Sequence, residues 1–229
     1  MLAGFFTPES VAVVGVSLEK EKLGNQILKN IIKGNFRGKI FPVNKKATEK
    51  TFLDGLKVYP ELTFIPEKVD LCIIVVPAPY VSSVIEKCGE KGIKSAAVIS
   101  AGFKETGEEG KKLEEEVVRK ARERGIRILG PNILGVINTS HNLNASFAPT
   151  YPPAGNIGFI SQSGALGCAF LDQCQQEGVG ISKFISLGNK ADLDEVDFIS
   201  FLGDDPDTQV ILGYLESINR GEEFIKIAK

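Results

Sequence analysis

The chain of 229 residues is 43% hydrophobic and 24% charged, with 27 basic and 29 acidic residues. This balance is ordinary for a globular protein and lacks the clustered excess of Lys and Arg that a nucleic-acid partner requires. No apolar run approaches the ~20 residues of a membrane span, and the N-terminus lacks a secretory signal pattern, so we expect a cytoplasmic protein that binds neither nucleic acid nor membrane.

Apolar runs alternate with amphipathic runs through the first half of the chain. Strands are expected at 11–15, 39–44, 71–79, 95–103 and 126–132, and helices at 23–34, 78–91 and 108–125. Continuous apolar strands separated by helices favour a parallel sheet that is covered on both faces. The sequence therefore predicts an α/β fold, with a doubly wound, Rossmann-like domain over residues 1–130.

The second half begins with a segment, residues 138–155, that has no clear periodicity and is rich in Asn, Ser and Pro. We expect it to be an ordered connection between two domains. Strands are then expected at 156–162, 182–188 and 209–217, and helices at 164–177, 193–203 and 221–228. Open parallel sheets of this kind usually have about five strands, so we expect residues 131–229 to hold the connection and a truncated α/β domain.

The loop after the first strand reads "VGVSLEKEKLG" in place of the G-x-G-x-x-G fingerprint of NAD-binding proteins. Gly15 permits the turn, and Ser17 offers a hydroxyl. Lys20 and Lys22 add positive charge before Gly24 closes the loop. The following helix N-terminus favours phosphate. The alternative is an ordinary strand–helix turn with solvated lysines.

The ends of the next two strands carry further candidate residues. The second strand ends in Asn44, Lys45 and Lys46, where an NAD site needs an acidic residue for the ribose hydroxyls. Lysines there attract a phosphorylated ribose, which both NADP and CoA carry. The third strand exits through Pro77 and Pro79, which would form a rigid apolar wall for adenine or pantetheine, or would simply end the strand.

The fourth strand is followed by Ser100, Ala101 and Gly102, which are small enough to leave room for a ligand. Because the carboxyl ends of parallel strands face one crevice, the four strand ends together predict one binding site. His141 is the one histidine of the chain and cannot form a site of several histidines, and Cys72, Cys88, Cys168 and Cys174 show no C-x-x-C spacing. We therefore expect reduced, structural thiols and no bound metal.

The second domain carries its own candidate site in "FISQSGALG". The hydroxyls of Ser161 and Ser163, Gly164 and the amides of the helix start would cradle an anion, for which phosphate is the best candidate. The alternative is a serine that only caps the helix. Glu216 lies at the end of the last strand on the same side, where a solvated glutamate is the alternative.

The motifs "ISAGFKE", "GPNxLG", "FISQSGALG" and "SLGNKADLDE" resemble the N-terminal part of NDP-forming acyl-CoA synthetases, and the resemblance covers essentially the whole chain. These enzymes include the ADP-forming acetyl-CoA synthetases and are related to the α subunit of succinyl-CoA synthetase. The resemblance implies a CoA-binding Rossmann-like domain followed by a flavodoxin-like ligase domain. It also implies interconversion of acyl-CoA, NDP and phosphate with acid, CoA and NTP, through an acyl phosphate and a phosphohistidine.

The resemblance further implies roles for the candidate residues. The loop from Gly15 to Gly24 would hold CoA, Asn44 and Lys45 would lie near its nucleotide end, and Pro77–Pro79 and Ser100–Gly102 would line its length. Ser161, Ser163 and Gly164 would hold the phosphoryl group, and Glu216 would orient the phosphohistidine.

One departure from the family pattern is serious, because no histidine follows Glu216. The resemblance implies that another chain supplies the histidine loop and an ATP-grasp nucleotide-binding subunit, and that this chain alone is inactive, as a truncated piece, a split-gene component or a fragment. A stand-alone CoA-binding or regulatory protein without catalysis stays open. An NADP-dependent redox protein also stays open, although its chemistry needs an acid or base in the crevice and none is convincing.

Overall fold

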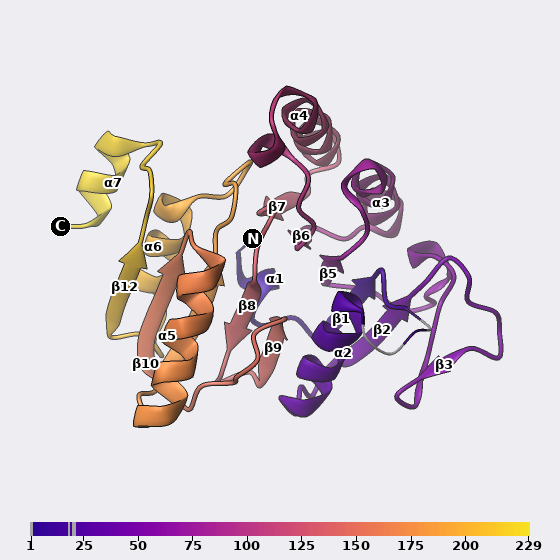
Figure 1. The fold of residues 1–229 in the computed structure, drawn as a ribbon, viewed down its shortest axis with the longest axis horizontal. Coiled ribbons are helices and arrows are strands. Elements are labelled where there is room, and N and C mark those ends of the chain that lie inside the picture. The colour runs from indigo at the N-terminus through magenta and orange to yellow at the C-terminus, as the bar shows by residue number, and fades with distance from the viewer. Residues whose placement is uncertain (1, 18, 20–21) are drawn as a thin grey trace.

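Two five-stranded β-sheets organise the chain, in a computed structural model that describes residues 2–17, 19 and 22–229 (Figure 1). The first sheet is parallel and holds β1 (Ser10–Val14), β2 (Lys39–Val43), β5 (Leu71–Ile74), β6 (Ser95–Val98) and β7 (Arg127–Leu129), in the spatial order β2-β1-β5-β6-β7. Counted along the chain this is the order 2-1-3-4-5, one of the two common doubly wound arrangements. The winding reverses between β1 and β5, so the loops after these strands open on one crevice.

Both faces of the first sheet are buried, which explains the continuous apolar runs in the sequence. Side chains alternate between the faces along each strand. Val11 and Val13 pack on the side of α2 (Leu23–Lys33), whereas Ala12 and Val14 pack on the side of α3 (Ala78–Lys91) and α4 (Glu108–Glu123). This arrangement confirms the predicted α/β fold.

Three of the strands in this sheet end clearly earlier than the sequence predicts, at Ile74, Val98 and Leu129. Residues 75–77 and the segment "ISAGF" therefore form loops at the strand exits, and "APY" (78–80) begins α3. Pro77 caps α3, and Gly102 has a positive φ of 103°, a left-handed conformation that favours glycine. Between β2 and β5 the chain forms a small hairpin, β3 (Phe52–Leu53) and β4 (Leu56–Lys57), for which no element is predicted.

The second sheet holds β8 (Gly135–Asn138), β9 (Leu143–Ser146), β10 (Ala154–Ser161), β11 (Ile181–Ser186) and β12 (Val210–Tyr214), in the spatial order β12-β10-β11-β8-β9. β10 lies parallel to β11 and β12, and β8 lies antiparallel to β11 and β9. The helix α5 (Gly164–Glu177) packs on one face and α6 (Glu195–Gly203) on the other, and α7 (Gly221–Ile227) follows β12.

The prediction of three strands in this domain is wrong, because the sheet has five, and the segment 138–155, expected as an ordered connection, contributes residues to β8, β9 and β10. β8 and β9 form an antiparallel hairpin whose turn contains Asn142 with a φ of 55°. Asn138, Asn144 and Ser146 are buried strand residues, and their side chains are hydrogen-bonded, with Ser146 Oγ donating to Asn144 Oδ1 at 2.6 Å. Because polar residues occupy inward positions, the alternation that marks a half-buried strand is missing from the sequence.

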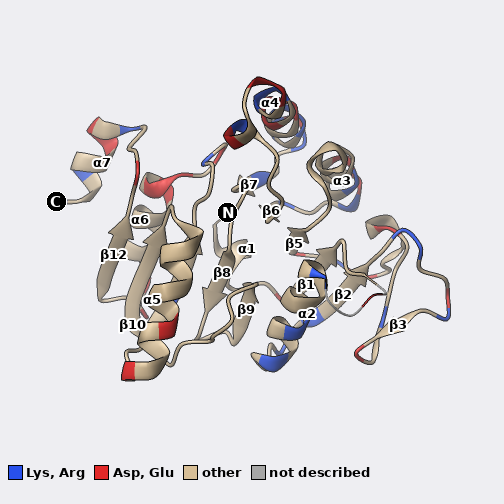
Figure 2. Ribbon diagram, in the orientation of Figure 1, with Lys and Arg blue, Asp and Glu red and all other residues tan. Residues whose placement is uncertain are grey.

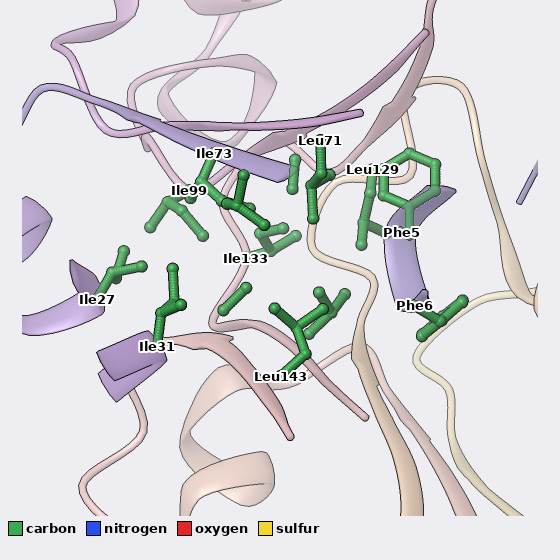
Figure 3. Packing of buried hydrophobic residues seen from close by; sticks show 14 of the residues in the cluster. Phe5, Phe6, Ile27, Ile31, Leu71, Ile73, Ile99, Leu129, Ile133 and Leu143 are labelled. Atoms are coloured by element: carbon green, nitrogen blue, oxygen red, sulfur yellow. The ribbon is translucent and has the colours of Figure 1, made fainter. Parts of the chain in front are cut away.

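One hydrophobic cluster joins the two sheets (Figure 3). Phe5 and Phe6 come from the short helix α1 (Ala3–Phe6) and pack in the same cluster as Leu71 of β5 and Leu143 of β9. The Phe6 ring also stacks on Phe201 of α6, with 4.8 Å between centroids. The N-terminus therefore helps to hold the second sheet against the first.

Three further features of the described residues bear on function. Their helices include none with the length and apolar character that crossing a bilayer demands. Among the same residues, no three His, Cys, Asp or Glu side chains gather as a set of metal ligands. The four cysteines are free thiols, and burial raises the pKa of Cys168 and of Cys174.

Candidate functional site

A cleft of about 870 Å³ opens at the carboxyl edge of the first sheet, where the winding reverses between β1 and β5. Its volume lies in the range of small-molecule and cofactor sites. Eight of the predicted residues line it: Gly15, Ser17, Lys22, Gly24, Asn44, Lys45, Lys46 and Pro77. The structure thus brings three of the four predicted strand ends together in one site. Lys20, also predicted for this loop, lies outside the described residues.

Glycines shape the loop after β1. Gly15 has a positive φ of 105°, and a Cβ there would lie 2.7 Å from the Val75 carbonyl oxygen. Gly24, in the first turn of α2, packs on the backbone of Gly15. The fingerprint of NAD-binding proteins uses its last glycine for the same close packing of helix on strand. The loop therefore keeps the packing of that motif while having a different length.

Two buried or half-buried amides fix the path of this loop. Asn25 is buried, and its Oδ1 accepts from the Ser17 amide at 2.8 Å. Its Nδ2 donates to the carbonyl oxygens of Ser17 at 2.9 Å and Glu19 at 2.7 Å. The Asn44 side chain donates to the Val16 carbonyl oxygen and accepts from the Lys46 amide. The Asn44 amide therefore supports the loop, and the backbone and the lysines are left to contact a ligand.

Basic side chains stand around the cleft, and Figure 2 shows Lys and Arg along α2 and in the segment after β2. Lys45 is exposed, with its Nζ 5.4 Å from the centroid of the Tyr80 ring. Lys22 Nζ lies 3.6 Å from Glu19 Oε2, and both side chains are largely exposed. Exposed ion pairs contribute about 0–1 kcal/mol, so these lysines can re-pair with the phosphate of a ligand at little cost.

The other predicted residues of the first domain lie outside this cleft. Pro79 is exposed in the first turn of α3. Ser100, Ala101 and Gly102 form a loop at the neighbouring strand end, where the Ser100 hydroxyl donates to backbone carbonyls at the exit of β5. The Gly102 amide donates to Glu105 Oε1 at 2.6 Å. This loop faces the second domain through Glu105, which also bonds Asn189.

The second candidate site is the turn between β10 and α5. Ser161 is buried, and its Oγ donates to the Ser163 carbonyl oxygen at 2.7 Å and accepts from the Ser163 amide. Ser163 Oγ accepts from the Leu166 amide, so Ser163 caps α5 as the alternative interpretation expects. Gly164 is exposed at the helix start, where backbone amides have no partner within the helix.

Glu216 lies beside this turn. Its backbone amide donates to Gln162 Oε1 at 2.9 Å, and the Gln162 amide donates to the Tyr214 carbonyl oxygen at 2.8 Å. The residue is exposed, so its carboxylate is available at the carboxyl edge of the second sheet. The structure therefore places the predicted glutamate next to the predicted anion cradle.

His141 lies at the other end of the second sheet. It lies in the turn after Asn138, and Asn138 pairs with Lys183 near the amino end of β11. Ser161 pairs instead with Ser186, at the carboxyl end of β11. Its Nε2 lies 2.8 Å from the Pro8 carbonyl oxygen, and its ring packs edge-on against Phe36. These contacts give His141 a structural role.

Two family models match the chain. Residues 9–139 match the CoA binding domain, and residues 154–229 match the succinyl-CoA ligase like flavodoxin domain. The chain belongs to the CoA-binding domain family. The resemblance predicted from the sequence motifs is confirmed, because the relatives include ADP-forming acetate–CoA ligases that match essentially the whole chain.

The chain is 47% identical over its full length to the α subunit of ADP-forming acetate–CoA ligase I of Pyrococcus furiosus, and it spans 50% of that subunit. It is 38% identical to the ADP-forming 4-hydroxybutyrate–CoA ligase of Nitrosopumilus maritimus, covering 97% of this chain and 32% of that protein. The solved structure of acetyl-coenzyme A synthetase 1 of Candidatus Korarchaeum cryptofilum matches with a TM-score of 0.95 and 47% identity, covering 100% of this chain and 49% of that one. These relatives do not favour a redox protein or a stand-alone regulatory protein.

The sequence motifs assign no role to three buried polar residues: Asn25, Asn189 and Lys190. An Asn directly after Gly24, at helical spacing from the apolar Leu28, could have marked the first. Asn189 and Lys190 stand within the motif "SLGNKADLDE", which marked the resemblance without indicating what its polar residues bind.

Proposed function

We propose that the chain is the CoA-binding portion of an ADP-forming acyl-CoA ligase. Residues 1–130 act as the CoA-binding domain, and residues 131–229 comprise the connection and a partial ligase domain. The observation that carries this proposal is the cleft at the β1–β5 reversal, which has Lys45 and Lys46 on its rim. Lysines at the end of the second strand favour a ligand with a phosphorylated ribose over NAD.

In this proposal, different lining residues of the cleft bind different parts of CoA. The loop from Gly15 to Gly24 and the start of α2 bind its pyrophosphate, because free amides and the helix dipole favour anions. Lys45 pairs with the phosphate on the ribose. Pro77 forms an apolar wall, and the loop Ser100–Gly102 lies along the way to the second domain.

The second domain handles the phosphoryl group in this proposal. Ser161, Ser163 and Gly164 hold phosphate, and Glu216 orients a phosphohistidine that another part of the enzyme supplies. The reaction interconverts acyl-CoA, NDP and phosphate with acid, CoA and NTP. Its carrier must form a labile P–N bond, which a neutral imidazole can do.

Partners are therefore part of the proposal. His141 is the one imidazole of the chain, and its ring is held by Pro8 and Phe36 far from Ser161. The histidine loop belongs to a part of the enzyme outside residues 1–229, and an ATP-grasp subunit binds the nucleotide. Free thiols in the described part of the chain fit a cytoplasmic location.

Incubation of the purified chain with an acyl phosphate tests this assignment. We expect no acid-labile phosphorylation, and no NTP from acyl-CoA, NDP and phosphate, until chains with the histidine loop and the nucleotide-binding domain are added. Label on His141, lost in the His141→Gln variant, would contradict the proposal.

A further inference from the structure

The buried side chain of Lys190 contacts the backbone next to Glu216. The Lys190 ammonium donates to Glu195 Oε2 at 2.9 Å and to the Ser217 carbonyl oxygen at 2.6 Å. On the other side, Gln162 Oε1 accepts from the amides of Glu216 at 2.9 Å and Ser217 at 3.3 Å. The backbone of Glu216 and Ser217 is thus held between the Lys190 side chain and the turn that contains Ser161 and Ser163.

The arrangement around Lys190 is unusual for a part of the core. Lys190 has a positive φ of 54°, a left-handed conformation that residues other than glycine rarely adopt. The Lys190 and Glu195 side chains are only 2% and 0% exposed. A buried ion pair seldom stabilises a fold more than apolar residues of the same volume would. Backbone strain and buried charge together indicate a function beyond stability, because such features gather at functional sites.

The segment that carries Lys190 is anchored on the first domain by its neighbour Asn189. Asn189 Nδ2 lies 2.6 Å from Glu105 Oε2 and 2.7 Å from Glu114 Oε2. Burial opposes ionisation of Glu105, but the hydrogen bonds from Asn189 and from the Gly102 amide outweigh it, so the pKa of Glu105 is lowered. The segment is therefore tied to the loop at the end of β6.

We propose that Lys190 is a positioning residue of the ligase reaction. It holds the Ser217 carbonyl oxygen and thereby fixes Glu216 beside the Ser161–Gly164 turn. This inference rests on the proposed function, since it assumes that Glu216 acts on the phosphohistidine. Lys190 itself is buried and touches no substrate.

Hydrogen exchange of individual backbone amides tests the positioning directly on this chain. In Lys190→Met, the amides of Glu216 and Ser217 should exchange about tenfold faster than in the wild type, because their segment can open locally. The matched control is Lys183→Met, which breaks a pair with Asp205, 3% and 9% exposed, near the amino end of β11. Unchanged exchange in Lys190→Met, or the same acceleration in both variants, would overturn the proposal.

A second variant tests the same proposal in case Lys190→Met does not fold. Lys190→Gln combined with Glu195→Gln removes both charges and leaves no unpaired ion in the core. It also removes the charged donor to Ser217, so the same faster exchange at Glu216 and Ser217 is expected. Exchange at the wild-type rate would overturn the proposal.

Kinetics of the reconstituted complex separate positioning from mere stability. Lys190→Met should lower kcat by about tenfold and change the KM for CoA by less than about twofold, whereas Lys183→Met should leave both near the wild-type values. An unchanged kcat in Lys190→Met would overturn the proposal. A wild-type complex without turnover would instead refute the proposed function, and the exchange result would still stand by itself.

Discussion

Gly24 lies so close to Gly15 that a Cβ on Gly24 would stand 2.5 Å from the Gly15 carbonyl oxygen. The clashing oxygen belongs to the backbone, which cannot move away by a change of rotamer as a side chain can. The helix α2 therefore begins directly on the turn that ends β1, and this contact sets the position of the helix start at the cleft.

Replacement of Gly24 by alanine should separate α2 from this turn. We expect Gly24→Ala to lower the free energy of unfolding by about 1–3 kcal/mol, as other overpacking substitutions do, and to weaken CoA binding. Urea unfolding and calorimetry measure the two effects. Gly203→Ala is the control, because a Cβ there has no atom within 4 Å. Wild-type stability in Gly24→Ala would show that the contact is not restrictive.

Asn25 makes the three hydrogen bonds that hold the loop at Ser17 and Glu19. Asn25→Ala removes three part-buried hydrogen bonds to the loop backbone, which should cost about 1–3 kcal/mol of unfolding free energy. CoA affinity should fall as well, because the loop loses its fixed path. The control is Gln176→Ala, which removes an exposed side-chain bond on α5. If both variants bind CoA equally well, the loop does not need Asn25.

Lys45 should distinguish CoA from dephospho-CoA. An exposed charged contact contributes about 0.5–1.5 kcal/mol, so Lys45→Ala should bind CoA about 2- to 10-fold more weakly and leave dephospho-CoA binding unchanged. Lys50→Ala, exposed and not among the cleft-lining residues, is the control. Equal affinity of the wild type for both ligands would remove this role for the lysine.

The ion pair between Asp194 and Arg220 should make stability depend on pH in acid. Burial opposes ionisation of Asp194, but hydrogen bonding to Arg220 outweighs it, so the pKa of Asp194 lies below its ordinary value of 3.8. The pair therefore contributes its full stabilisation above that value and loses it as the pH falls through the lowered pKa. Urea unfolding should show a smaller loss of stability below about pH 4 in Asp194→Asn than in the wild type.

Asn at position 194 keeps a side-chain oxygen to cap α6, as Asp194 does for the Val196 amide, so the helix start is preserved in this variant. Asp172→Asn, on the surface of α5, is the matched control and should follow the wild type. An identical pH dependence in Asp194→Asn and the wild type would mean that the pair does not govern acid stability.

The sequence predicts the central parallel strands of the first sheet well because β1, β5 and β6 are apolar runs buried on both faces. It does not predict the hairpin of β8 and β9, because Asn138 and Ser146 occupy buried positions. The rule that ligands bind at strand carboxyl ends finds eight lining residues of the cleft. It does not find Asn25 or Lys190, because their partners depend on which segment packs against them.

Calorimetric titration of the chain with CoA, NADP and NAD tests the central claim most directly. CoA should bind at a single site, more tightly than NADP, because the cleft would contact its pantetheine arm as well as its phosphates, and NAD should not bind measurably. Tight binding of NAD without binding of CoA would contradict the assignment of the cleft.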